Sequence, residues 1–89
     1  MAHLSTTELA AVLQKTAQKV EVGGAYVHYR SPDKPYKVLQ VGLFEENEEP
    51  CVVYQSMVGD ELIWVRPLHS FLEQIELSGK MVARFQKIC

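Results

Sequence analysis

The chain has few cysteines and no long apolar run. Its two cysteines, Cys51 and Cys89, belong to no CxxC pair and to no His/Cys spacing that would suit zinc. No apolar stretch approaches the roughly 20 residues that span a membrane, and the N-terminus lacks the charged-then-apolar layout of a signal peptide. These absences predict two free thiols, no metal site and no membrane segment, and they favour a cytoplasmic location.

An excess of charge of one sign is lacking too. Nine basic and eleven acidic residues give a net charge of -2 and a pI near 5.9. A broad basic field of the kind that supports non-specific nucleic-acid binding is therefore excluded, whereas a local basic patch is not. With 89 residues, 47% of them hydrophobic, the chain fits one small globular domain that buries about 60–65% of its unfolded surface.

Recognisable catalytic motifs are missing. The sequence contains no Gly-rich phosphate loop, no GxSxG elbow and no HExxH pair. His28 and Glu46 could act as a general acid/base pair, but nothing in the sequence fixes the distance between them. An enzyme is therefore the less favoured class of function, and no cofactor is expected.

The N-terminal segment, residues 1–22, predicts an amphipathic helix. Ser5 followed three residues later by Glu8 is a capping box, and Gly23-Gly24 ends the helix. The apolar stripe needs a cover, either the rest of this chain or a second copy in a homodimer formed through the helix. The residues of this stripe are Leu9, Val12, Leu13, Thr16 and Val20.

From residue 23 to residue 89 the pattern predicts a β domain. Short β-rich runs alternate with turn chemistry such as SPDKP and the acidic loop EENEEP. The segment LHSFLEQI after Pro67 is typical of one helical or 3₁₀ turn. The fold expected is mainly β (α+β): a small five-stranded SH3-like barrel preceded by the helix. The five runs are AYVHYR, YKVLQVGLF, CVVYQSM, LIWVRP and MVARFQKI.

The hairpin formed by the runs CVVYQSM and LIWVRP decides which side chains are predicted to be buried. If Gly59-Asp60 is a two-residue turn, Gln55 lies opposite Trp64 and Val53 opposite Arg66. The other face of the hairpin is drier and is the predicted core face. The core side chains expected on this basis are Val52, Tyr54, Ile63 and Val65, together with Leu39 and Val41.

Trp64 and Arg66 suggest a ligand site because residues two apart on a strand share a face. A Trp face can stack on a ring, and an Arg fork can hold a phosphate or carboxylate. The leading hypothesis is a binding module for a nucleotide, a short nucleic acid or an acidic peptide. The predicted ligand-binding residues are Tyr26, His28, Tyr36, Gln55, Trp64 and Arg66.

Two alternatives stay open for these residues. Arg66 could pair with Glu46 or Glu49 and lie along the Trp64 ring in a purely structural contact. Alternatively, the whole patch could be buried in a homodimer of a structural or interaction protein. A ligand site leaves Trp64 partly exposed in the free protein, whereas a packing site does not.

Several motifs in order resemble one bacterial family. YxHY at Tyr26–Tyr29, YKVL at Tyr36–Leu39, EPxVVY at Glu49–Tyr54, WVRPLxxF at Trp64–Phe71 and RF at Arg84-Phe85 are similar to the family catalogued as domain of unknown function 1653. The resemblance implies a compact β-rich domain and carries over no activity. It also shows a departure, because Phe44 stands where such sequences usually have a histidine.

Overall fold

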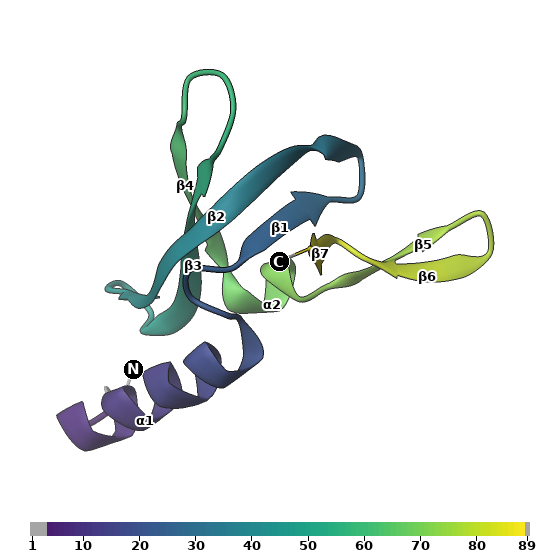
Figure 1. The fold of residues 1–89 in the computed structure, drawn as a ribbon. Helices are drawn as coiled ribbons and strands as arrows, with labels where there is room; N and C mark the ends of the chain where they lie inside the picture. Colours follow the sequence, from purple (N-terminus) through teal and green to yellow (C-terminus); the bar gives the residue numbers. More distant parts are fainter. Residues whose placement is uncertain (1–3, 89) are drawn as a thin grey trace.

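The computed structural model describes residues 4–88, which form two helices and seven strands (Figure 1). Neither helix is long and apolar enough to cross a membrane. In chain order the elements are α1 (Thr6–Lys19), β1 (Ala25–His28), β2 (Ser31–Phe44), β3 (Glu49–Ser56), β4 (Ile63–Pro67), α2 (Leu68–Phe71), β5 (Gln74–Leu77), β6 (Lys80–Ala83) and β7 (Phe85–Lys87).

Helix α1 begins at the predicted capping box. The Ser5 hydroxyl accepts a hydrogen bond from the Glu8 backbone N–H at 3.2 Å, and the Glu8 carboxylate accepts one from the Ser5 N–H at 2.9 Å. The helix packs against β2 and β3 of its own chain, with Thr16 and Val20 buried. Leu9, Val12 and Leu13 of the stripe are only half-buried, so the rest of the chain covers the stripe in part. Gly23, with φ at +87°, provides the left-handed turn that leads into β1.

The main sheet has five antiparallel strands in the order β4-β3-β2-β1-β7. The 14-residue β2 holds it together, because its first part pairs with β1 and its second part with β3. A mainly β domain preceded by a helix is thus confirmed. The barrel is not, because within residues 4–88 the edge strands β4 and β7 do not pair with each other.

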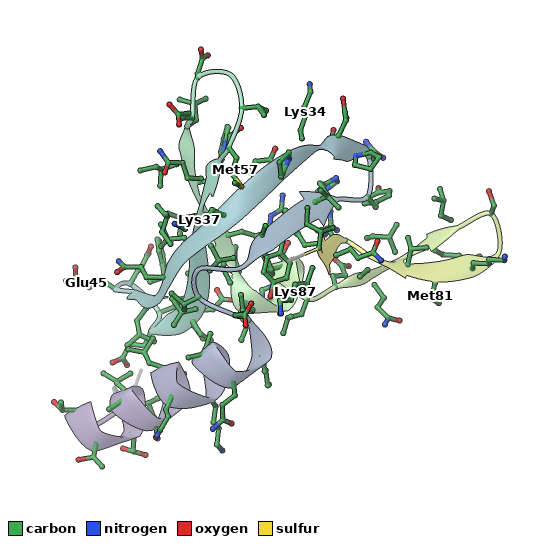
Figure 2. All side chains as sticks on the ribbon, in the orientation of Figure 1. Lys34, Lys37, Glu45, Met57, Met81 and Lys87 are labelled. Atoms are coloured by element: carbon green, nitrogen blue, oxygen red, sulfur yellow. The ribbon has the colours of Figure 1, made fainter. Side chains whose placement is uncertain are left out.

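A separate two-stranded hairpin, β5 and β6, projects from the body of the molecule (Figure 1). Its tip is Ser78-Gly79, and both residues have positive φ. Met81 lies on this hairpin, away from the main sheet (Figure 2). The predicted single strand MVARFQKI is therefore two strands. They are divided at Arg84, whose N–H bonds to the Glu73 carbonyl rather than to a strand partner.

The predicted two-residue turn between β3 and β4 is wrong. The loop has five residues, 57–61, and is closed by a hydrogen bond from the Ser56 N–H to the Leu62 carbonyl at 3.0 Å. Glu61 joins Gly59 at positive φ, which lets the chain reverse over the longer loop. As a result Gln55 lies opposite Ile63, one position away from the expected register.

This shift turns β4 over relative to β3, since a slip of one residue exchanges the two faces of a strand. Ile63 and Val65 are 58% and 62% exposed, so their prediction as core residues was wrong. Trp64 lies opposite Tyr54, and Arg66 lies opposite Val52, on the core side of the sheet.

The core gathers on that side around two stacked rings. The ring centroids of Phe71 in α2 and Phe85 in β7 lie 4.3 Å apart, and the planes of the two rings are 5° from parallel. Leu39 and Val41 are half-buried, since β2 has a register shift between Val38 and Gln40 that interrupts the alternation of faces. The buried cluster comprises Val20, Tyr26, Val38, Val52, Tyr54, Leu68, Phe71 and Phe85.

Candidate ligand-binding site

A pocket of about 200 Å³ lies on the core side of the main sheet. Each of the five strands contributes at least one side chain, since alternate residues of every strand point to this side. The pocket is therefore a product of the whole sheet and not of one loop. Its lining consists of His28 from β1, Tyr36 from β2, Tyr54 from β3, Trp64 and Arg66 from β4, and Phe85 from β7.

Aromatic rings in edge-to-face contact form its walls. The ring centroid of Tyr54 lies 5.3 Å from that of Tyr36, with an angle of 82° between the ring planes. It also lies 5.3 Å from the ring centroid of Phe85. Phe85 is buried and stacks on Phe71. Such contacts are favourable beyond the area they bury, so these walls belong to the hydrophobic core and hold their shape without a ligand.

Arg66 supplies a cation that no carboxylate neutralises among residues 4–88. Its Nε donates to the Tyr54 hydroxyl at 3.3 Å and its Nη1 donates to Ser70 Oγ at 2.9 Å. The pairing with Glu46 or Glu49 considered from the sequence is not formed, and Glu49 lies 2.6 Å from His69 Nδ1 instead. Guanidinium has five N–H donors, so three of them remain for a ligand.

The ionisation of His28 is affected by its position in the pocket. Its pKa is lowered, first by partial burial and then by the charges of Arg66, Arg84 and Arg30. Its Nδ1 accepts a hydrogen bond from the Arg30 N–H at 3.2 Å, so the neutral ring carries its proton on Nε2. A chain with a net charge of -2 thus has a locally basic pocket.

Trp64 is 49% exposed at this pocket and is the chain's one tryptophan. The ligand-site hypothesis predicts that Trp64 is exposed in the free protein, and the side chain is indeed not buried within the chain. An indole with an open face beside an uncompensated guanidinium can take a planar group that carries negative charge.

Two of the six predicted site residues lie elsewhere. Tyr26 is in the core, with its ring against Phe71 and its hydroxyl accepting from the Glu21 N–H at 3.0 Å. Gln55 lies on the opposite face of the sheet and donates to the Glu61 carbonyl at 2.8 Å. The other four, His28, Tyr36, Trp64 and Arg66, line the pocket together.

Sequence reasoning missed Tyr54 and Phe85. Tyr54 would have followed from the correct register of the β3–β4 hairpin, since it lies opposite Trp64. Phe85 lies opposite His28 across the β1–β7 pair, which joins residues 57 positions apart. No local pattern indicates a contact of that range.

The structure does not bring His28 and Glu46 together. His28 lies where β1 ends, next to the start of β2, whereas Glu46 lies in the turn beyond the other end of β2. Lys34 and Glu45 in Figure 2 mark these opposite ends. Among the described residues, no group of three or more His, Cys, Asp or Glu side chains could hold a metal ion.

A comparison with solved structures supports the fold described above. A crystal structure of a DUF1653 protein from Bordetella bronchiseptica has a TM-score of 0.67 and 23% identity, covering 80% of this chain and 90% of that chain. No curated protein matches the chain significantly. Residues 24–87 match the family described as "Protein of unknown function (DUF1653)". With more than half of its length matched, and with the motifs from YxHY to RF in order, the chain belongs to the DUF1653 family.

Proposed function

We propose that this protein is a binding module whose pocket takes an aromatic anion, with a nucleotide as the simplest ligand. The observation that carries the proposal is the uncompensated guanidinium of Arg66 inside an aromatic pocket, next to a half-exposed Trp64. Base stacking on an indole and charge-assisted hydrogen bonds to a phosphate use these two groups together.

Ligands of other chemistry use only part of the site. An acidic peptide would engage Arg66 and leave the indole face unused. A methylated cation would suit the rings, but Arg66 would repel it. The volume of about 200 Å³ is below the roughly 300–1,000 Å³ of pockets that enclose drug-sized ligands. A mononucleotide, or the end nucleotide of a short strand, that the pocket encloses only in part fits this size best.

The experiment is a fluorescence titration, because Trp64 is the chain's single tryptophan. Adenosine monophosphate and uridine monophosphate should quench its emission saturably. Adenosine supplies the ring without the anion, and inorganic phosphate supplies the anion without the ring, so each should bind more weakly. A short acidic peptide and a four-nucleotide strand separate the remaining ligand classes. No saturable change with any nucleotide at millimolar concentration would reject the proposal.

A further inference from the structure

The outer edge of β4 presents backbone groups that pair with no other strand among residues 4–88. In an antiparallel pair, opposed residues alternate between those that bond to each other and those that point away. Ser56 and Leu62 are bonded, so the register places Trp64 and Arg66 in bonding positions and turns the N–H and C=O groups of Ile63 and Val65 away from β3. Within residues 4–88 no other strand pairs with this edge.

On one face of this edge strand the side chains are apolar and exposed. Ile63 and Val65 lie on the sheet face opposite the pocket, in line with the half-buried Val53. Proteins usually protect an edge strand with charge, with proline or with a covering segment. Here Pro67 blocks the end of β4, and the four residues before it are left able to pair.

From this edge we infer that β4 pairs antiparallel with β4 of a second copy, about a twofold axis that passes by Trp64. In this register Ile63 lies opposite Val65 of the second copy, and the outward N–H and C=O groups of both residues form four hydrogen bonds. The same pairing packs Ile63 against Val65 on the exposed face.

A copy of β4 suits this edge, and the register centred on Trp64 is the one in which every bonded pair is complete. A register centred on Val65 would place Pro67, which has no N–H, opposite Ile63, so each of these two pairs would form one hydrogen bond instead of two. In the register centred on Trp64, Arg66 lies opposite Leu62 of the second copy, so the two Arg66 side chains do not face each other. The homodimer expected from the sequence would then form through β4 instead of α1, part of whose stripe packs against its own sheet.

This dimer needs no ligand in order to form, although it would change the surroundings of the pocket. Trp64 lines the pocket, so the axis would bring the two indoles, and with them the two pockets, side by side on one face of a continuous sheet. The contact is short. Interfaces that bury less than about 1,200 Å² belong to weak encounters, so a concentration-dependent dimer is expected.

Sedimentation equilibrium of the full chain over a wide range of concentration tests the pairing. The mass should rise from 10.1 kDa toward twice that value. Ile63→Lys and Val65→Lys should each raise the dissociation constant at least tenfold, because they place charge on the paired edge. Val58→Lys is the matched control, an exposed apolar residue in the β3–β4 loop outside the pairing register. A mass that stays at one chain, or a dimer that the two edge variants leave unchanged, overturns the inference.

Cross-linking tests the register itself. On a Cys89→Ser background, with Cys51 buried, Trp64→Cys should oxidise to a disulfide-linked dimer, because residues on the axis in a non-bonded pair have Cα atoms about 4.5 Å apart. Val65→Cys alone should not cross-link, whereas a mixture of Ile63→Cys and Val65→Cys chains should. Circular dichroism confirms that each variant is folded. Cross-linking of Val65→Cys chains as fast as of Trp64→Cys chains contradicts the proposed axis.

Discussion

The guanidinium carbon of Arg66 lies 5.4 Å from the centroid of the Phe85 ring. Phe85 in turn stacks on Phe71, at the centre of the core. The cation of the pocket is thus held on the buried aromatic rings and by the Tyr54 and Ser70 hydroxyls, not by a mobile loop. An arginine fixed in this way loses little side-chain freedom when an anion binds.

Arg66→Ala should weaken nucleotide binding by about 1.5–3 kcal/mol, the range for a hydrogen bond to a charged group. The fold should stay intact, since Arg66 is half-exposed and bonds only to hydroxyls. Arg66→Lys keeps the charge but loses the planar fork, so it should restore part of the affinity. The Trp64 titration gives the affinities and circular dichroism gives the fold. If Arg66→Ala unfolds the chain, Arg66 belongs to the scaffold.

The two faces of the sheet should respond differently to truncation. Phe71→Ala removes a ring that is 2% exposed and should cost about 3–5 kcal/mol, a large share of the roughly 5–15 kcal/mol that stabilises a small domain. Ile63→Ala, on the exposed face, should change the free energy of unfolding by less than about 1 kcal/mol. Urea melts at low protein concentration measure both. Equal losses would show that the reversed orientation of β4 is wrong.

Stability should fall between pH 7 and pH 5 through His28. Its pKa in the folded chain lies below the ordinary value of 6.5, so the unfolded chain binds more protons in this range. The stabilisation by neutral His28 is complete above pH 6.5 and is lost as the pH falls through the folded-state pKa. His28→Asn keeps an acceptor for the Arg30 N–H and should flatten this slope.

His69→Asn is the control for that measurement, because His69 pairs with Glu49 at a distance from the pocket lining. Denaturant melts at a series of pH values give the slopes for both variants. The assignment to His28 fails if the slope of His28→Asn equals that of the parent chain.

The N-cap of α1 should contribute measurably to stability. Ser5→Ala removes the hydroxyl that accepts from the Glu8 N–H and should cost about 0.5–2 kcal/mol. Thr7→Ala, an exposed change in the same first turn, is the matched control. The two urea midpoints should differ, with Ser5→Ala the lower. Identical midpoints would mean that α1 frays without affecting the unfolding of the sheet.

Local chemistry was sufficient to predict α1, its capping box, α2 and most strands. The Ser5/Glu8 pair and Pro67 act within a few residues, so their effect can be read directly from the chain. The β5–β6 hairpin was missed because Gln74–Leu77 follows α2 closely and continues an apparent helical turn. Its pairing with β6 depends on the Ser78-Gly79 turn.

The candidate site was harder to predict because it depends on register and on distant pairing. Positive φ at Glu61, a residue type that seldom adopts it, extended the β3–β4 loop and exchanged the faces of β4. Trp64 and Arg66 still share a face after the exchange, because two residues apart they turn over together. For the same reason Gln55, on the neighbouring strand, moved away from them.

Because its lining comes from β1, β2, β3, β4 and β7, the pocket exists only while the whole sheet is folded. A ligand that binds there has no site on the unfolded or partly folded chain, so its binding energy adds to the global free energy of unfolding. At a concentration 100 times its dissociation constant this amounts to about 2.7 kcal/mol. For a domain of this size that corresponds to a rise in melting temperature of roughly 10 °C or more. Thermal melting against a library of small aromatic anions is therefore a direct way to search for the natural ligand.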